Sequence, residues 1–332
     1  MTVKNKISNK KVLVTGGAGF IGSNICDTLL SQNNVVVCLD NFITGKKENV
    51  SHLFDYDNFK LVEGDIRNLA DCKKAVDGVE IVLHQAALGS IPRSIKDPLT
   101  TNAVNVNGFI NILMSAKDAG VKRIVYASSS SVYGDSTVLP KTENVIGEPI
   151  SPYAITKRVN ELYAKVFAEI YSLEIIGLRY FNVYGMRQDP YSTYAAAIPK
   201  FINAILNHEA PVINGDGTYS RDFTFVEDVV QVNQLAALTD NSLAINQIYN
   251  VAAGERNTIN TLFEILKKNL VSFNNDLNSV FPVYGPVRQG DVPHSHASID
   301  KAVNLLGYNP KYSFNEGLKK TVEWYVENIN PK

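Results

Sequence analysis

Short continuous apolar runs alternate with amphipathic stretches through the first half of the chain. The runs span residues 11–15, 35–39, 59–63, 81–85, 123–128 and 174–179. Those at 12–14 and 35–37 are apolar at every position, which is typical of strands that are covered on both faces. The alternation of such strands with helical stretches predicts an α/β fold with a doubly wound parallel sheet.

The pattern becomes irregular after residue 180. Prolines at 190, 199 and 211 and the turn-rich segment 214–217 indicate a smaller module with long loops. Within it, residues 226–238 predict a helix, and residues 247–252 predict a buried strand that returns to the sheet. We therefore predict a sheet domain made of residues 1–181 and about 222–252. It is interleaved with a second, smaller α/β domain made of residues 182–221 and 253–332.

Three glycines, Gly16, Gly19 and Gly22, lie between the first predicted strand and a predicted helix at 21–30. A backbone at this place turns tightly and approaches a pyrophosphate, whose charge the helix N-terminus favours. Asp40 ends the second predicted strand, eighteen residues beyond Gly22, where the acid that binds an adenosine ribose belongs. Asn41 follows, and no arginine stands beside Asp40 to neutralise a 2′-phosphate, so the pattern favours NAD over NADP. A glycine-rich turn without a ligand is the alternative.

A second motif, Tyr153 and Lys157, lies near the middle of the chain. Four residues apart on a helix, the two side chains share a face. The ammonium and the positive nicotinamide of the cofactor would together have to lower the Tyr153 pKa from its usual value of about 10 to make it a base near neutrality. Such a tyrosine is a candidate general base. The serines at 128–131 follow a predicted strand, at the sheet edge where doubly wound folds bind ligands, and Ser129 could bridge Tyr153 and a substrate hydroxyl. The alternatives are a solvated helix pair and a polar turn.

Composition removes several classes of function. The 332 residues carry a formal net charge of −1 without a basic run, which argues against nucleic acid or a membrane surface as a partner. The cysteines at 26, 38 and 72 have no metal-ligand spacing, and the histidines at 294 and 296 lack a carboxylate cluster, so no metal is predicted. No apolar stretch reaches membrane-spanning length, and the start lacks an apolar leader. We therefore expect a soluble cytoplasmic protein.

With these motifs the chain resembles the extended short-chain dehydrogenase/reductases, and among them the nucleotide-sugar 4-epimerases. The resemblance covers essentially the whole chain and rests also on Asp65-Ile66, on the segment 84–87 and on the segment 179–185. It implies a Rossmann-type domain that binds NAD and a second domain that binds a UDP-sugar, with Ser129, Tyr153 and Lys157 as the catalytic set. The cofactor-binding residues that it implies are Gly16, Gly19, Phe20, Ile21, Gly22, Asp40, Asn41, Asp65, Ile66, Gln85, Ala86, Ala87, Tyr153, Lys157 and Tyr180.

The same resemblance implies a set of residues for the nucleotide sugar. Two arginines match the diphosphate clamp of the family, an aspartate would accept from the uridine ribose, and residues 196–201 resemble the uracil-binding stretch. The substrate-binding residues are Ser90, Ser129, Ser130, Asn182, Ala196, Lys200, Arg221, Arg288, Asp291 and Ser295.

Two places in the sequence restrict the predicted reaction type and the predicted sugar. Dehydratases and decarboxylases of the family carry an acid shortly after the catalytic hydroxyl residue, whereas this chain has Ser130 and Ser131. Ser295 aligns with a tyrosine that lines the C2 side of the pocket in UDP-galactose-specific epimerases, and a serine there leaves room for an acetamido group. We therefore expect 4-epimerisation of UDP-N-acetylglucosamine and UDP-N-acetylgalactosamine through a 4-keto intermediate, in surface-polysaccharide synthesis.

Several alternatives stay open. The substrate could instead be UDP-glucose and UDP-galactose, or an acetamido uronic acid whose C6 carboxylate meets Arg93 or Arg187. A catalytically idle NAD-binding protein is a third alternative. The stretches 99–119 and 152–171 are amphipathic, and the resemblance implies a homodimer that forms through them. They could equally cover the sheet as helices with wet outer faces.

Overall fold

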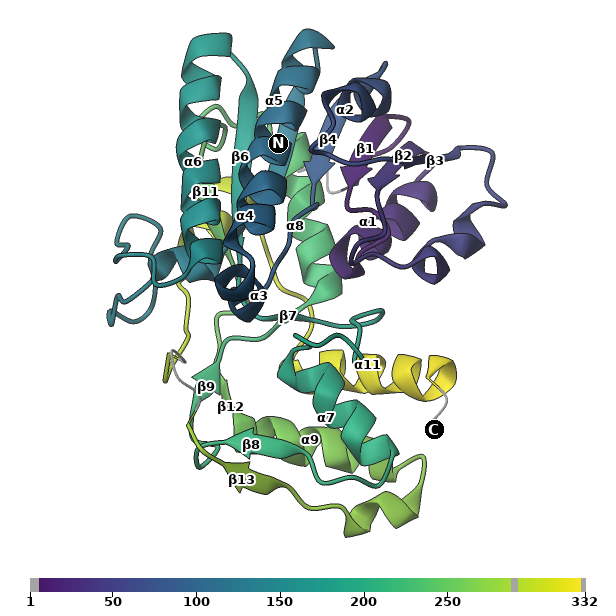
Figure 1. Ribbon diagram of the computed structural model, residues 1–332, viewed down its shortest axis with the longest axis vertical. Coiled ribbons are helices and arrows are strands. Elements are labelled where there is room, and N and C mark those ends of the chain that lie inside the picture. The colour runs from purple at the N-terminus through teal and green to yellow at the C-terminus, as the bar shows by residue number, and fades with distance from the viewer. Residues whose placement is uncertain (1–5, 288–291, 330–332) are drawn as a thin grey trace.

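Seven parallel strands form a central sheet in the larger part of the molecule (Figure 1). The computed structural model describes residues 6–287 and 292–329. The strand order is β11-β6-β5-β4-β1-β2-β3, so β1 lies between β2 and β4, and the direction of winding reverses between β1 and β4. The strands are β1 (Lys11–Thr15), β2 (Val35–Asp40), β3 (Phe59–Glu63), β4 (Ile81–His84), β5 (Arg123–Ser129), β6 (Glu174–Tyr180) and β11 (Ile248–Val251).

Helices cover both faces of this sheet. One face carries α1 (Phe20–Leu30), α8 (Val226–Leu238) and α10 (Asp300–Leu306). The other face carries α2 (Leu69–Val76), α5 (Gly108–Asp118) and α6 (Pro152–Tyr171). Two short helices, α3 (Ile91–Lys96) and α4 (Pro98–Asn102), lie against α6, and a π-helical turn (Ala103–Asn107) joins α4 to α5.

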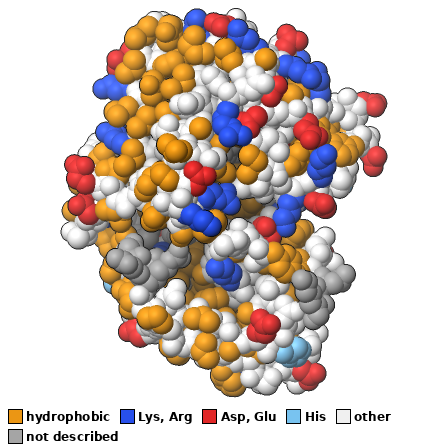
Figure 2. Space-filling model, viewed as in Figure 1, with side chains coloured by type: hydrophobic (Ala, Val, Ile, Leu, Met, Phe, Trp, Pro, Cys, Tyr) orange, Lys and Arg blue, Asp and Glu red, His pale blue; other side chains and the backbone are white. Residues whose placement is uncertain are grey.

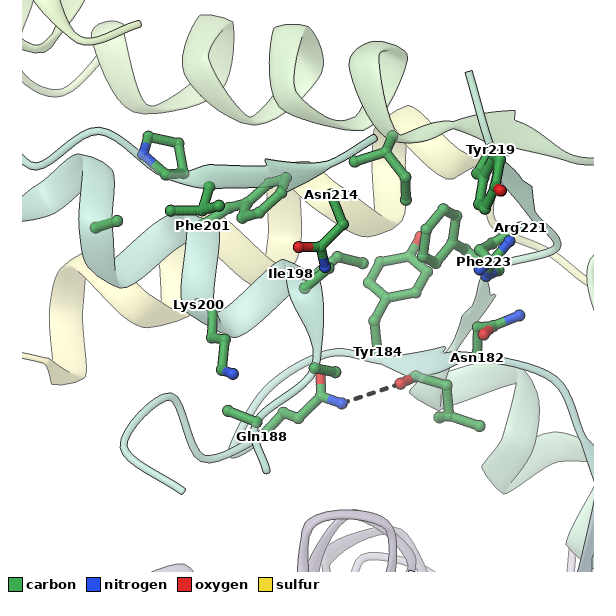
Figure 3. A pocket seen from close by; sticks show the side chains of 18 of the residues that line it. Asn182, Tyr184, Gln188, Ile198, Lys200, Phe201, Asn214, Tyr219, Arg221 and Phe223 are labelled. Carbon is green, nitrogen blue, oxygen red and sulfur yellow. Dashed lines mark hydrogen bonds between the residues drawn. The ribbon is translucent and has the colours of Figure 1, made fainter. Parts of the chain in front are cut away.

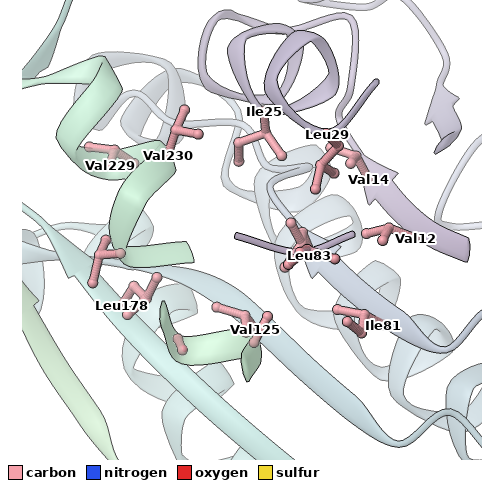
Figure 4. Close-up of a cluster of buried hydrophobic side chains, with 14 of the residues drawn as sticks. Val12, Val14, Ile25, Leu29, Ile81, Leu83, Val125, Leu178, Val229 and Val230 are labelled. Atoms are coloured by element: carbon pink, nitrogen blue, oxygen red, sulfur yellow. The ribbon is translucent and has the colours of Figure 1, made fainter. Parts of the chain in front are cut away.

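The apolar strands are explained by the core that they form with these helices. In Figure 4, Ile25 and Leu29 of α1 and Val229 of α8 point toward Val14 and Leu83 of the sheet. These side chains are almost completely buried. Because each buried aliphatic side chain contributes about 1.5–3 kcal/mol, covering both faces favours strands that are apolar at every position.

The predicted fold class is confirmed. Strands β1 and β3 and helix α8 have the predicted ends, and the other predicted strands of the sheet end within one residue of their predicted limits. The strand predicted to return from the second half is β11, which pairs in parallel with β6 at one edge of the sheet.

The smaller part of the molecule contains α7 (Ala197–Leu206), α9 (Ile259–Val271) and α11 (Phe314–Asn328), which pack around one apolar cluster (Figure 1). Three short strand pairs accompany them. These are β7 (Val183–Tyr184) with β10 (Thr224–Phe225), β8 (Val212–Asn214) with β13 (Val283–Gly285), and β9 (Ser220–Arg221) with β12 (Asn257–Thr258).

The predicted division of the chain needs one correction. The prediction assigns residues 253–332 to the second domain, whereas α10 contributes Ala302 and Leu306 to the core of the sheet. Just after this helix, the Tyr308 hydroxyl donates to the Ala252 carbonyl at 3.0 Å. Helix α10 packs against β11 and α8, so the chain crosses back to the larger part at this helix.

Within residues 6–287 and 292–329, no helix has the length and apolarity that a membrane span requires. The same part of the chain holds no cluster of three His, Cys, Asp or Glu side chains arranged for a metal ion. All three cysteines are free and buried. Cys26 and Cys38 fill the core between α1 and β2, where a small apolar side chain packs well.

Candidate active site

A cavity of about 330 Å³ lies at the carboxyl ends of β1, β2 and β4, where the winding of the sheet reverses. Doubly wound sheets bind nucleotides at this point, because the loops from the two halves of the sheet separate there and leave a crevice. Most of the residues predicted to bind NAD line this cavity. They are Gly16, Gly19, Phe20, Ile21, Gly22, Asp40, Asn41, Ile66, Gln85, Ala86 and Ala87.

The turn from β1 into α1 accepts only glycine at two positions. Gly16 has a φ of +67°, and a Cβ on it would lie 2.8 Å from the backbone of Ala86. A Cβ on Gly22 would lie 2.1 Å from the Gly16 carbonyl oxygen. Helix α1 therefore starts directly at the cavity, and no side chain caps its first turn. This cradle fits the pyrophosphate of NAD, since backbone N–H groups at a helix N-terminus bind anions.

Asp40 faces the same cavity and is held in place by the backbone. Its Oδ2 accepts from the Ala18 N–H at 2.9 Å, and its Oδ1 accepts from the Phe42 N–H at 2.8 Å. Burial raises the pKa of Asp40, and these two N–H groups oppose the rise. Each carboxylate oxygen keeps a second lone pair that can accept a ribose hydroxyl.

Asp65 does not line the cavity, although its neighbour Ile66 does. The Asp65 carboxylate pairs with the Arg67 guanidinium at 2.6 Å and accepts from the Asn41 amide at 2.8 Å. The hydrogen bonds from Arg67 lower the pKa of Asp65 to about 2, so this carboxylate stays charged. Its place in the structure is beside Asn41, and its part in cofactor binding stays a prediction.

Gln85 and Tyr180, both predicted at the cofactor, are joined by a residue that the sequence did not single out. The Tyr180 hydroxyl donates to Gln85 Oε1 at 3.0 Å and accepts from Asn233 Nδ2 at 2.8 Å. Gln85 Nε2 in turn donates to Asn233 Oδ1 at 3.0 Å. The three side chains form a closed ring between β4, β6 and α8, which holds Gln85 at the edge of the cavity.

The three predicted catalytic residues are brought together by β5 and the start of α6. Ser151 caps α6 by accepting from the Ala154 N–H. Tyr153 is hydrogen-bonded to Ser129, and Lys157 donates to the Ala127 carbonyl at 2.7 Å. The described contacts include no hydrogen bond between Tyr153 and Lys157. The Lys157 ammonium donates to a carbonyl oxygen of β5.

The expected contribution of Lys157 to a lower Tyr153 pKa is not found among the described contacts, whereas the contribution of the nicotinamide stays a prediction. Burial raises the pKa of Tyr153, and only the hydrogen bond from Ser129 opposes this rise. Burial also lowers the pKa of Lys157 to about 8, against an opposing effect of Glu161. His84, buried behind them and bonded to Thr15, has its pKa lowered to about 3 by burial and by Lys157, so it is neutral.

A second cavity, of about 630 Å³, lies in the smaller part of the molecule between α7 and the strands β7, β8 and β9. Figure 3 shows the polar side chains of Asn182, Lys200 and Arg221 around an apolar wall that includes Phe201 and Phe223. In the space-filling view the surface is hollowed between the two parts, and Lys and Arg side chains gather around the hollow (Figure 2). Two cations beside an aromatic wall suit a nucleotide diphosphate.

The predicted substrate residues are divided between this cavity and its surroundings. Asn182, Ala196, Lys200 and Arg221 line it. Asn182 donates to the Asp222 carbonyl at 2.9 Å, which fixes its amide. Arg221 donates to the Pro293 carbonyl at 3.1 Å, so its guanidinium is anchored to the segment that carries Ser295. The predicted residues Arg288 and Asp291 lie outside the described residues.

The remaining predicted residues, Ser90, Ser129, Ser130 and Ser295, line neither of these two cavities. Ser90 caps α3, and its hydroxyl accepts from the Arg93 N–H at 3.2 Å. Ser129 ends β5 and is hydrogen-bonded to Tyr153, and Ser130 begins the 3-10 turn (Ser130–Tyr133) that follows. Ser295 is half-buried, and its N–H donates to the Ser220 carbonyl at 3.0 Å.

Two buried side chains at the site were missed. Asn105, in the π-helical turn, accepts from the Leu88 N–H at 2.8 Å and donates to Thr156, next to Lys157. Glu161 lies one helical turn after Lys157 and is buried. Asn105 and Glu161 each lie within an apolar face of a helix, and this is the sequence signal that could have indicated them. A polar residue at such a position is rarely buried without hydrogen-bond partners.

A parallel sheet with a pyrophosphate turn at its switch point, next to a Ser-Tyr-Lys set, defines a nucleotide-dependent enzyme of the short-chain dehydrogenase/reductase type. The family model described as the NAD dependent epimerase/dehydratase family matches residues 12–252, and the chain belongs to this family.

Similar proteins cover almost the whole chain. A UDP-N-acetylglucosamine 4-epimerase from Methanobrevibacter ruminantium, solved in complex with UDP-N-acetylmuramic acid, is 40% identical with a TM-score of 0.90, covering 97% of this chain and 100% of that one. A putative UDP-glucose 4-epimerase of Methanocaldococcus jannaschii is 38% identical over 318 residues, 96% of this chain and 99% of the relative. A UDP-glucuronic acid 4-epimerase from Bacillus cereus, solved with UDP-glucuronic acid and NAD, is 30% identical with a TM-score of 0.86, covering 96% and 99%. The chain is thus an NAD-dependent UDP-sugar 4-epimerase, an isomerase.

Proposed function

We propose that this UDP-sugar 4-epimerase interconverts UDP-N-acetylglucosamine and UDP-N-acetylgalactosamine. The observation that carries the proposal is the position of Ser295. Its backbone is bonded to Ser220, next to Arg221 of the nucleotide cavity, and two residues later the chain bridges to Lys141, in the loop that follows the catalytic serines. Ser295 thus lies beside the strand that carries Arg221. A small hydroxyl side chain there leaves space for an acetamido group, which a tyrosine would fill.

The relatives support this substrate class without deciding it. The similar protein from Methanobrevibacter ruminantium is a UDP-N-acetylglucosamine 4-epimerase, whereas others act on UDP-glucose or UDP-glucuronic acid. Their common element is the UDP group, for which Lys200 and Arg221 provide two cations in the second cavity. Selection of the sugar therefore depends on the few side chains between the two cavities.

The roles of the chain's own residues follow from their positions. With NAD bound, its positive nicotinamide and Lys157 would favour the Tyr153 phenolate. This phenolate takes the proton of the C4 hydroxyl, and Ser129, hydrogen-bonded to Tyr153, orders that hydroxyl. NAD, when bound, supplies the acceptor for the C4 hydride. The diphosphate stays bound at Arg221 and Lys200 while the 4-keto sugar turns its other face to the cofactor. Tight binding at the nucleotide end and a loose sugar pocket are thus what the reaction requires.

The test is proton NMR of the anomeric region on purified protein without added NAD. UDP-N-acetylglucosamine and UDP-glucose are followed in parallel tubes. The proposal predicts faster conversion of the acetamido sugar, without consumption of an external oxidant, because the cofactor is regenerated in each cycle. Faster conversion of UDP-glucose would refute the substrate assignment and keep the reaction.

A variant tests the role of Ser295 directly. Ser295→Tyr should lower kcat/KM for UDP-N-acetylglucosamine by about tenfold to a hundredfold, since an added aromatic ring collides with the acetamido group. The same variant should keep its activity on UDP-glucose, which serves as the internal control. An equal loss on both sugars would mean that Ser295 acts through folding or through the nucleotide and not at C2.

An acetamido uronic acid is the second candidate substrate, and one arginine favours it. The Arg93 guanidinium lies 5.2 Å from the centre of the Tyr194 ring, on the α3 side of the site, and no ion pair of Arg93 is found among the described residues. Arg187, the other predicted partner of a C6 carboxylate, is instead paired with Asp27 of α1. This candidate would be favoured if a UDP-N-acetylhexosaminuronic acid is converted while neither UDP-N-acetylglucosamine nor UDP-glucose is.

We also propose that the protein is a homodimer formed through α6 and α4. An apolar row along α6, made of Ile155, Leu162, Val166 and Ile170, is exposed, and Leu99 of α4 is 83% exposed. Residues at this spacing share one face of a helix, and a second copy of the chain would bury this row together with Leu99. Sedimentation equilibrium should give a dimer for the wild type and a monomer for Leu162→Glu with Ile170→Glu. A monomeric wild type would contradict the proposal.

A role in surface-polysaccharide synthesis and a cytoplasmic location belong to the same proposal. The proposed products, acetamido UDP-sugars, would be substrates of that synthesis. The three free, buried thiols are compatible with a reducing compartment. Loss of N-acetylgalactosamine from surface polymers in a strain without this protein is the expected result, and an unchanged polymer would contradict the assigned role.

A further inference from the structure

Helix α6 carries Tyr153 and Lys157, and a third ionisable residue, which is buried, lies on the same face of this helix. Glu161 follows Lys157 after four residues, and its side chain is 1% exposed. Neither Glu161 nor the groups that bind it line the two cavities. A carboxylate buried at this depth costs several kcal/mol unless it is fully paired, so its presence behind the catalytic set calls for a reason.

Glu161 is fully paired. Its Oε1 accepts from the Ser128 hydroxyl at 2.7 Å and from Arg179 Nε at 2.8 Å. Its Oε2 accepts from Arg179 Nη2 at 2.9 Å and from Arg158 Nη1 at 3.0 Å. The fork of Arg179 thus holds the carboxylate with two parallel hydrogen bonds, a geometry with strong orientational preference. Tyr126 and Lys157 are the other titratable groups that interact with this carboxylate.

These partners lie directly beside the reacting groups. Ser128 and Arg179 are register partners in β5 and β6, and the next pair in the same register is Ser129 with Tyr180. Three consecutive residues of β5 therefore bind three consecutive turns of α6. The Ala127 carbonyl binds Lys157, the Ser128 hydroxyl binds Glu161, and Ser129 binds Tyr153.

The charges around Lys157 come from a small number of groups. On its own helix it faces Tyr153 and Glu161, on β5 the Ala127 carbonyl, and on β4 His84. Burial lowers the pKa of His84 to about 3, so it is neutral, and burial raises the pKa of Tyr153. Glu161 is consequently the one anion that these contacts place near the ammonium.

We propose that Glu161 is a positioning residue of the reaction, which fixes α6 to the ends of β5 and β6 and holds Lys157 as an ammonium beside Tyr153. This inference rests on the proposed function, since it assigns the role to the same catalytic set. In the absence of the carboxylate, α6 loses its tie to β5 and β6, and the buried ammonium loses its balancing charge. Binding of the UDP-sugar is unaffected, because Glu161 does not line the nucleotide cavity.

The experiment compares Glu161→Gln with wild-type holoenzyme. Loss of the anion should move the fall of kcat at alkaline pH downward by about one pH unit, with KM for the UDP-sugar changed less than about twofold. The matched control is Glu169→Gln, which removes an exposed carboxylate from the same helix and should leave the profile unchanged. Because Glu161→Gln leaves Arg179 buried without its partner, the double variant Glu161→Gln with Arg179→Gln gives the same test in a folded protein. Of the two arginines that bind Glu161, it leaves only the part-exposed Arg158 without its ion pair.

A second readout separates this inference from the proposed function. The ¹³Cε resonance of Lys157, assigned by its loss in Lys157→Met, reports the charge of the ammonium without any turnover. A lower titration midpoint in the double variant supports the role of Glu161 even if the wild type converts no acetamido sugar, in which case the substrate assignment alone fails. An unchanged midpoint together with a wild-type kcat profile would overturn the inference.

Discussion

The ring of Gln85, Tyr180 and Asn233 allows a sharp prediction about buried hydroxyl groups. Tyr180→Phe removes one hydroxyl that donates to Gln85 at 3.0 Å and accepts from Asn233 at 2.8 Å. The phenyl ring stays in the core of the sheet, so packing is nearly unchanged. Asn233 Nδ2 keeps a bond to the Val229 carbonyl, but Gln85 Oε1 loses the donor that Tyr180 provided.

The magnitude follows from two lost hydrogen bonds in a buried place. Each contributes about 0.5–1.5 kcal/mol net, so Tyr180→Phe should lower the free energy of unfolding by about 1–3 kcal/mol. With an unfolding entropy of about 2.1 cal/mol/K per residue, this chain length gives a fall in Tm of about 1.5–4 °C. The double variant Asn233→Ala with Tyr180→Phe should lose less free energy of unfolding than the two single variants lose in sum. The reason is that the two side chains share one hydrogen bond.

The matched control is Tyr126→Phe in the neighbouring strand β5. Tyr126 is 1% exposed, and its hydroxyl has no hydrogen-bond partner among the residues that the structure describes. Removing a buried hydroxyl that is unpaired should leave stability unchanged or raise it by up to about 1 kcal/mol. The assay is calorimetry at equal NAD saturation, because bound NAD raises Tm by itself. Equal losses in the two variants would refute the argument that the hydrogen bonds of Tyr180 matter.

Three further predictions concern the site. Tyr153→Phe should lower kcat by about 10²–10⁴-fold while NAD stays bound, as checked by turnover and by release of the cofactor on acid treatment; wild-type activity would remove Tyr153 from the mechanism. Gly22→Ala should abolish retained NAD, since its Cβ would lie 2.1 Å from the Gly16 carbonyl oxygen, and normal NAD content would show that the turn can open. Burial raises the pKa of Asp222 to about 7. The folded protein therefore keeps a proton that the unfolded chain releases above about pH 4, and its stability falls from there to pH 7. Urea unfolding of Asp222→Asn should lack this component, and an identical pH dependence would contradict it.

Much of the cofactor half could be predicted because its signals are local. Three features of this half are determined by residues adjacent in sequence. They are an apolar run covered on both faces, a glycine at a positive φ and an acidic residue at the end of a strand. The sequence therefore predicted β1, the turn at Gly16 and the place of Asp40, and the structure brings all three to one cavity. The family resemblance added Asn182, Lys200 and Arg221, which come together in the second cavity.

The tertiary structure alone decided which buried polar groups meet. Asn233 reaches Gln85 across 148 residues of sequence, and nothing in the spacing of an amide on α8 indicates that partner. Burial, likewise, is a property of the packed molecule, and it reverses the expected direction of the Tyr153 pKa. The hydrophobic pattern thus determined the sheet, its helices and the pyrophosphate turn, whereas the charge state of the catalytic helix depends on Glu161 and Arg179, which only the folded chain places side by side.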